Sequence, residues 1–258
     1  MPSVTYRIKQ VAQPRGGYIN PRQFEVRELD IPKPPHSHKD EGVAPGLIGT
    51  AVDYLTRFMN GTSVDQAFRV SIRGADLVGE DPALYLEDVT GLDDKSIVAA
   101  IRLAGYDSAF RAGLPAYRPV SEIEVGTNAI ENVRAMVAAG MVFFAEYGSV
   151  VHDGITFPGG YTEIVDSGDG DFMTADTIWD FKVTVKPPTK EHTLQIAMYW
   201  LMGLHSQFAG DYRNVRRLGF FNPRLATVYT IEVAGIPIET LHEIEVQVIG
   251  YAETEAIY

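Results

Sequence analysis

The residues best suited to catalysis are Asp180 and Lys182, in the segment Asp-Phe-Lys. Residues 177–184 are rich in β-branched and aromatic side chains, which predicts a strand. Because side chains alternate between the two faces of a strand, Asp180 and Lys182 should share one face while Phe181 packs on the other. The pair alone is weak support for a catalytic site, since an ordinary solvated ion pair is the simpler interpretation.

A second carboxylate, Asp171, precedes Asp180 on a neighbouring predicted strand. Residues 171–174 favour a strand and Ala175-Asp176 a turn, so antiparallel pairing can bring Asp171 beside Asp180. Two carboxylates that converge from adjacent strands form an oxygen-ligand site suited to Mg²⁺ or Mn²⁺. With Lys182 to orient or deprotonate a metal-bound water, such a site could hydrolyse a phosphodiester.

The next segment predicts an amphipathic helix over residues 191–208. Gln195 and Tyr199 are four residues apart and therefore share one helix face, with His192 on the same side one turn earlier.

The order Asp171, Asp180-Phe-Lys182 and Gln195-Ile-Ala-Met-Tyr199 resembles the PD-(D/E)XK nuclease signature followed by a Gln-x-x-x-Tyr motif. It is similar to the RecB-type branch, which includes lambda-type exonucleases and the CRISPR adaptation nucleases. The resemblance implies that both aspartates bind metal, that the lysine is catalytic, and that Gln195 and Tyr199 help to place DNA. One departure is Gly170, which stands where the motif has proline.

The resemblance covers residues 146–233 well and the first 125 residues poorly. It reaches residues 218–224, which implies that Arg224 contributes to substrate binding, and more weakly residues 49–58. Within the latter, Asp53 and Arg57 are most simply a surface ion pair, being four residues apart on a helix.

Glu146, at the end of the long helix predicted over residues 128–147, is the candidate third metal ligand. The helix end is apolar nearly all round, so we expect it to be buried, where a lone carboxylate is costly unless it is paired or bound to metal. Relatives often place a glutamate at this point. The alternative is a helix-terminal glutamate that reaches solvent.

Composition limits the other possibilities. The chain has no cysteine, which excludes disulfides, thiolate zinc sites and cysteine-ligated iron–sulfur clusters. The formal net charge is −12, so any contact with DNA should be local and metal-mediated. Basic residues after the motif either supply that local positive charge or form an ordinary solvated face: Lys186, Lys190, Arg213, Arg216, Arg217 and Arg224.

Patterning along the chain predicts an N-terminal arm and linker over residues 1–45, then one nuclease-like domain over residues 46–258. A helical region (46–147) should precede an αβ core (146–258), with helices near 48–59, 64–77, 95–103, 128–147 and 237–249. A strand over residues 161–166 is expected to pair with 171–174, and two more cover 217–221 and 226–233. The expected fold is α/β (α+β), a restriction-endonuclease-like mixed sheet flanked by helices with a helical N-terminal elaboration.

The sequence therefore predicts a Mg²⁺- or Mn²⁺-dependent deoxyribonuclease. The preference for an exonuclease or a repair and recombination nuclease comes from the resemblance alone. A catalytically silent binding or assembly module with the same fold is the main alternative, and a non-nuclease metallohydrolase is a weaker one. We expect no membrane partner and a cytoplasmic location, because no membrane span or signal peptide is evident. The family resemblance also admits a homo-oligomer, since processive relatives form rings.

Overall fold

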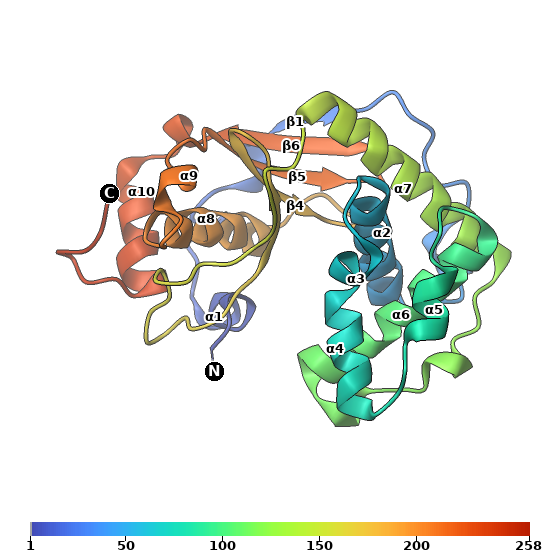
Figure 1. Ribbon diagram of the computed structural model, residues 1–258. Coiled ribbons are helices and arrows are strands. Elements are labelled where there is room, and N and C mark those ends of the chain that lie inside the picture. The colour runs from blue at the N-terminus through green and yellow to red at the C-terminus, as the bar shows by residue number, and fades with distance from the viewer. Residues whose placement is uncertain (1) are drawn as a thin grey trace.

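A six-stranded mixed sheet lies at the centre of the protein, and helices cover both of its faces (Figure 1). The computed structural model describes residues 2–258. The strand order is β1-β6-β5-β4-β3-β2. The strands are β1 (Glu25–Glu28), β2 (His152–Ile155), β3 (Gly170–Met173), β4 (Thr177–Phe181), β5 (Arg217–Asn222) and β6 (Thr227–Glu232). The predicted mixed sheet flanked by helices is thus confirmed.

Strand directions follow from the lengths of the connections. The short links between β3 and β4 and between β5 and β6 give antiparallel pairs, and β2 is antiparallel to β3 after a longer loop over residues 156–169. β4 and β5 are parallel, because the chain returns through α8 (Lys190–Leu204) and the short α9 (Ala209–Tyr212) before it pairs again. This crossover sets α8 against the sheet directly after β4.

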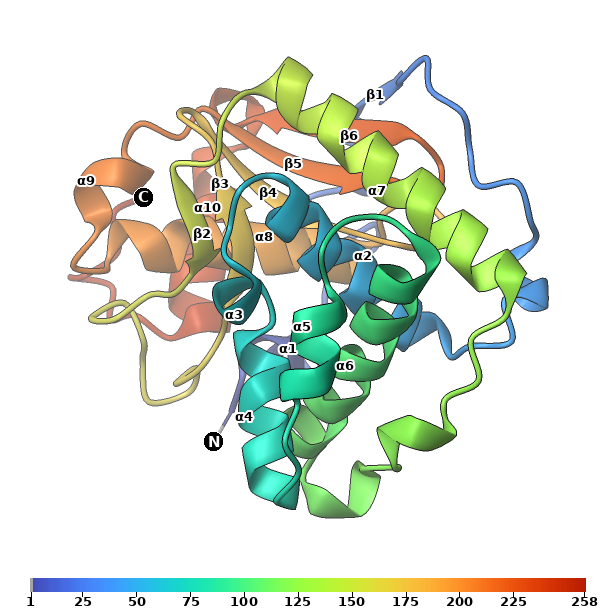
Figure 2. The same ribbon diagram turned by 45° about the vertical axis from the view of Figure 1, so that its right-hand side comes forward.

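The two faces of β4 belong to different cores. Ile178 packs with buried residues of α8, whereas Trp179 and Phe181 pack on the other face against Phe143 of α7 (Thr127–Tyr147). Figure 2 shows α7 running along that face of the sheet. By alternation, Asp180 projects toward α8.

The helical region packs beside one end of the sheet around its own core. It comprises α2 (Pro45–Met59), α3 (Val64–Ala67), α4 (Arg69–Val78), α5 (Ala83–Asp88), α6 (Asp94–Ala112) and the first half of α7. Ser63 and Asp93 cap α3 and α6, each accepting a backbone N–H through its side chain. The single helix predicted over 64–77 is divided at Phe68, which is buried in this core.

The ends of the chain also join the fold. α1 (Val4–Gln10) contributes Val4 and Ile8 to the core around α8, and β1 forms an edge strand of the sheet. After β6, α10 (Ile238–Glu243) continues into a π-helical turn, η6 (Ile244–Ile249), within the helix predicted there. Among residues 2–258, no helix has the length and apolar character needed to span a bilayer.

The strand predicted over residues 161–166 is wrong. These residues form a tight turn in which the Thr162 backbone N–H donates to the Val165 carbonyl, and Val165 is fully buried. The alternation of apolar and polar residues over 161–166 therefore results from this turn and not from pairing with a neighbouring strand. β2 takes the expected position beside β3.

Candidate functional site

The β3–β4 hairpin brings the two motif aspartates together, as the sequence predicts. Phe172 pairs with Trp179, so the next opposed positions are Asp171 and Asp180. Asp171 Oδ2 accepts the backbone N–H of Phe181 at 2.6 Å, and Asp180 is only 4% exposed. Burial first, and then the charges of Asp180 and Asp53, raise the pKa of Asp171 well above its usual range. The two carboxylates therefore repel each other in a poorly hydrated position.

Lys182 supplies the positive charge beside this pair. Its backbone N–H donates to the Phe221 carbonyl at 2.9 Å, which extends the β4–β5 pairing by one residue. Its Nζ lies 2.7 Å from Asp180 Oδ2 and donates to Gln195 Oε1 at 3.2 Å. Burial lowers the pKa of Lys182, but the carboxylates of Asp180 and Asp171 outweigh burial and raise it overall. The ammonium stays protonated at neutral pH.

Gln195 and Tyr199 lie on the face of α8 that meets these groups. Gln195 Nε2 donates to the Tyr199 hydroxyl at 2.7 Å, so a continuous chain of polar contacts links Tyr199, Gln195, Lys182 and Asp180. The Tyr199 ring stacks on the Phe157 ring, with 5.4 Å between the ring centroids, and Tyr199 is almost fully buried. The two motifs that were far apart in sequence thus form one polar network.

A third carboxylate comes from α2, where the sequence predicted only a surface ion pair. Asp53 Oδ1 is enclosed and has no hydrogen-bond partner among residues 2–258. Burial raises the pKa of Asp53 to about 6; Arg57 opposes this shift, while Asp153 and Asp180 add to it. Gly49 lies one turn earlier on the same face, next to Val183, and also lines the cavity, but no local feature of the sequence marks Asp53 itself.

A cavity of about 430 Å³ opens onto these groups. The first two turns of α2 line one side of it, through Pro45, Gly46, Gly49, Thr50 and Asp53; Asp171 and residues 181–184 line the other, together with His192. Burial, and then the Lys182 ammonium, lower the pKa of His192, so its imidazole is neutral at pH 7.

The acidic side chains are close without forming a closed cage. Among residues 2–258, no three acidic or histidine side chains already point their donor atoms at one centre. The charges of Asp53, Asp171 and Asp180 nevertheless act strongly on one another. Asp180 directs Oδ2 toward the Lys182 ammonium, 2.7 Å away.

Glu146 does not lie at this site, so the expectation of a buried third ligand at the end of α7 is wrong. The residue is exposed and forms an ion pair with Arg27 of β1. The apolar residues near the helix end, Phe143 and Phe144, turn toward the sheet, which leaves Glu146 on the solvent side. Its carboxylate is therefore solvated and paired, and it has no need of a metal.

Arg224 does not line this cavity either. It lies in the β5–β6 turn, buried, and its guanidinium donates to both carboxylate oxygens of Glu41, at 2.7 and 3.2 Å. Asn132 of α7 donates to the same carboxylate at 2.7 Å. This enclosed network ties residues 38–45 to the sheet, so Arg224 has a structural role rather than the expected role in substrate binding.

Two ion pairs fasten the helical region to the sheet next to the site. Arg57 of α2 approaches Asp153 of β2 with Nε 2.7 Å from Oδ1, and its Nη2 donates to Oδ2 at 2.9 Å. The side chains are only 12% and 17% exposed. Arg111 of α6 lies 3.8 Å from Asp169, just before β3. These contacts hold α2, and with it Asp53, over the β3–β4 hairpin.

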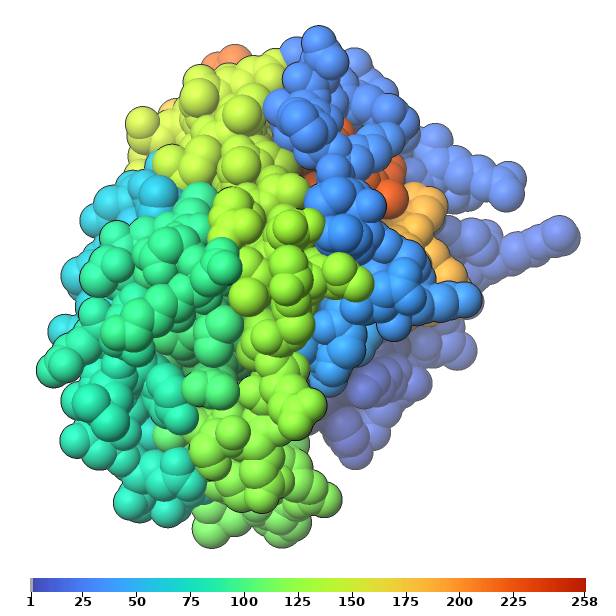
Figure 3. All heavy atoms as spheres, turned by 90° about the vertical axis from the view of Figure 1, so that its right-hand side faces the viewer, coloured from blue at the N-terminus to red at the C-terminus, as the bar shows by residue number. Residues whose placement is uncertain are grey.

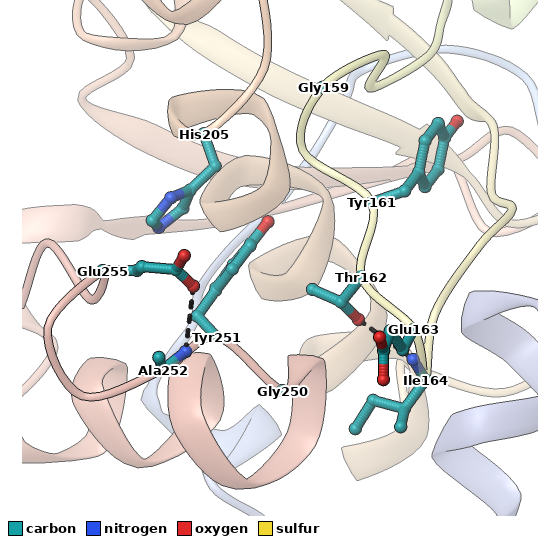
Figure 4. Close-up of a pocket in the computed structure, with 10 residues that line it drawn as sticks. All are labelled: Gly159, Tyr161, Thr162, Glu163, Ile164, His205, Gly250, Tyr251, Ala252 and Glu255. Atoms are coloured by element: carbon teal, nitrogen blue, oxygen red, sulfur yellow. Dashed lines mark hydrogen bonds between the residues drawn. The ribbon is translucent and has the colours of Figure 1, made fainter.

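A larger cavity of about 860 Å³ lies away from the carboxylates, between the loop before β3 and the C-terminal residues (Figure 4). His205 stacks on Tyr251 there and hydrogen-bonds the buried Glu245 at 2.7 Å. Glu245 also accepts the backbone N–H groups of Ile257 and Tyr258. These polar groups hold the end of the chain in place, so the cavity lacks a free catalytic set.

Comparison with protein-family models gave no match, and comparisons with curated proteins and with solved structures found no protein of significant similarity.

Proposed function

We propose that the protein is a Mg²⁺- or Mn²⁺-dependent nuclease of the PD-(D/E)XK type that hydrolyses phosphodiester bonds in DNA. One observation carries the proposal: Asp53, Asp171 and Asp180 meet from three elements beside Lys182, and Lys182 is held by Gln195 of the adjacent helix. A purely structural ion pair would need one carboxylate, whereas this site gathers three that repel one another.

The donor set fits a divalent cation. Mg²⁺ and Mn²⁺ prefer carboxylate oxygens and retain water ligands, and Asp53, Asp171 and Asp180 would hold such an ion. The enclosed, unpartnered Oδ1 of Asp53 and the raised pKa of Asp171 are the features that a cation would relieve. When bound, the ion would supply a Lewis acid for a phosphoryl oxygen and lower the pKa of a water ligand.

Lys182 would act as a fixed cation rather than as a base in this arrangement. Its raised pKa keeps the ammonium charged, and its contacts with Asp180 and Gln195 fix the position of Nζ. A positioned ammonium stabilises the negative charge that grows on the phosphoryl oxygens during attack. Gln195 and Tyr199 are positioning residues in this scheme, because they act through Lys182.

The start of α2 favours an anionic substrate on the same side of the cavity. Ala44 precedes the helix and offers no capping side chain. Pro45 has no N–H and the N–H groups of Leu47 and Ile48 donate to the Ala44 carbonyl, so within residues 2–258 the donor left without an acceptor in this turn is the N–H of Gly46, which lines the cavity. The positive end of a helix dipole attracts phosphate groups. A phosphodiester would therefore meet Lys182 on one wall and the α2 N-terminus on the other.

The direct test is cleavage of linear and plasmid DNA with and without Mn²⁺. We expect metal-dependent cleavage by the natural protein and a loss of at least about 100-fold in the Asp180→Ala and Lys182→Ala variants. The matched control is Lys95→Ala, because Asp93-Asp94-Lys95 repeats the same spacing at the exposed start of α6. That variant should retain full activity.

Retained cleavage in either site variant would overturn the mechanism. If the natural protein cleaves no DNA, titration calorimetry with Mn²⁺ separates the remaining explanations. If the natural protein binds Mn²⁺ and the Asp171→Asn variant does not, the metal site exists and serves the hydrolysis of a substrate other than DNA. The absence of binding near neutral pH would favour a silent binding module.

A further inference from the structure

A groove of about 920 Å³ lies between the N-terminal residues and the segment that leads into α8. Three cationic side chains and no acidic residue line it. Its lining comprises Arg15, Gly16, Asn20, Pro21, Arg22, Phe24, Val26, Pro187, Pro188, Lys190 and Tyr229, and we call it the basic groove. Figure 3 shows the blue N-terminal residues lying against orange residues of the C-terminal half on this side of the molecule.

The basic groove is joined to the carboxylate site through the sheet. Asp180 pairs with Phe220, Phe220 with Tyr229, and Tyr229 with Val26, so one row of side chains crosses four strands on the α8 face. Three strand spacings of about 4.8 Å place Val26 about 14 Å from Asp180. Residues 182–190 form a second link, since their first part lines the carboxylate cavity and their last part lines the groove.

The groove cations are free of acidic partners. Among residues 2–258, none of Arg15, Arg22 and Lys190 forms an ion pair, whereas Arg27, Arg57 and Arg224 all do. Both arginines are exposed and Lys190 is half-buried beside Gly17.

Of the acidic residues nearest in sequence, Glu191 interacts electrostatically with Lys190 and offsets part of this charge without forming an ion pair. Glu25 of β1 shares the strand face of Arg27, which is opposite to Val26, and neither it nor Glu191 lines the groove. The result is a local positive surface on a protein of net charge −12.

We propose that the basic groove binds the phosphate backbone of the DNA strand whose scissile bond lies at the carboxylates. This inference rests on the proposed nuclease function for the identity of the strand. The three strand spacings, about 14 Å, correspond to only a few nucleotides of one strand. Phe24 and Tyr229 are buried in the groove floor, which indicates backbone contact rather than base stacking.

The first test is oligonucleotide binding in EDTA, which prevents cleavage, measured by fluorescence anisotropy over a range of salt concentrations. The groove variant is Arg15→Gln/Arg22→Gln/Lys190→Gln. The control is Lys39→Gln/Arg73→Gln/Arg118→Gln, which removes the same charge from exposed sites elsewhere. Loss of three phosphate contacts should reduce the salt-dependence slope by about 2 and weaken binding about 100-fold at 0.1 M salt. The control should bind as the natural protein does.

The second test is cleavage with Mn²⁺ of the same oligonucleotide and of bis-p-nitrophenyl phosphate, which is too short to reach the groove. The groove variant should raise KM for the oligonucleotide and leave cleavage of the small diester unchanged. If the groove and control variants bind and cleave the oligonucleotide equally well, the basic groove does not bind DNA, and the proposed nuclease function is unaffected. If the natural protein cleaves no DNA but the groove variant still binds DNA more weakly, the groove proposal is supported and the nuclease proposal is contradicted. An equal loss of binding to polyglutamate would contradict a nucleic-acid groove and indicate an acidic protein partner.

Discussion

At Tyr199, one hydroxyl oxygen determines how Gln195 is oriented. The hydroxyl accepts the Gln195 amide N–H, which turns Gln195 Oε1 toward the Lys182 ammonium. The ring itself is held separately, by stacking on Phe157. The hydrogen-bonding and packing roles of this residue can therefore be separated experimentally.

For the proposed nuclease, we predict that Tyr199→Phe lowers kcat about 10-fold with little change in KM, because Gln195 loses its fixed orientation while the ring still packs. Gln195→Ala and the double variant Gln195→Ala/Tyr199→Phe should be equally slow, since both residues act through Lys182. Steady-state kinetics check this result. Tyr212→Phe, another buried tyrosine against α8, is the control and should be fully active. Additive losses in the double variant would contradict the model of a single polar chain.

At the scale of elements, α2 positions Asp53 because Arg57 binds Asp153 across the boundary between the helical region and the sheet. Replacement of Arg57 by glutamine removes this bidentate contact and leaves two enclosed carboxylates without a cation. We predict a loss of about 3 kcal/mol in the free energy of unfolding, measured by urea denaturation.

The exposed pair formed by Arg27 and Glu146 provides the comparison for that experiment. It also joins a strand to a helix, but water solvates both partners. Arg27→Gln should therefore leave the urea midpoint unchanged. Similar midpoints in Arg57→Gln and the natural protein would show that α2 is held by apolar packing alone.

At the scale of the whole molecule, the proposed metal would connect the helical region with the sheet, since Asp53 comes from one and Asp171 and Asp180 from the other. Ligands that bind only the folded state stabilise it by about 2.7 kcal/mol at 100 times their Kd. For a chain of this size we predict a rise in Tm of roughly 5 to 10 °C on saturation with Mn²⁺, reversed by EDTA.

Asp53→Asn should reduce this rise in Tm, because one proposed ligand is lost. Asp65→Asn, which removes the same charge from an exposed position on α3, should show the full rise. Thermal denaturation of the three proteins with and without Mn²⁺ makes the comparison. If Mn²⁺ raises the Tm of Asp53→Asn as much as that of the natural protein, Asp53 is not a metal ligand and the metal site is confined to the β3–β4 hairpin.

Local periodicity in the sequence was enough to predict which site residues share a face within one strand, hairpin or helix. Strand alternation put Asp180 and Lys182 on one face, the short turn at 175–176 brought Asp171 opposite Asp180, and helical spacing put Gln195 and Tyr199 on one side of α8. These relations hold within a strand, a hairpin or a helix, so neighbouring residues are enough to specify them.

The tertiary structure alone decided what approaches that hairpin. Asp53 replaces Glu146 as the third carboxylate because α2 lines the cavity beside Asp171, whereas the end of α7 packs on the opposite face of β3 and β4 and leaves Glu146 paired with Arg27 at the surface. The predicted basic cluster divides in the same way: Lys190 joins Arg15 and Arg22 in the basic groove, whereas Arg217 and Arg224 are paired elsewhere. Such contacts depend on how distant elements bury their apolar faces against each other, and the periodicity of one segment does not encode the partner of its polar face.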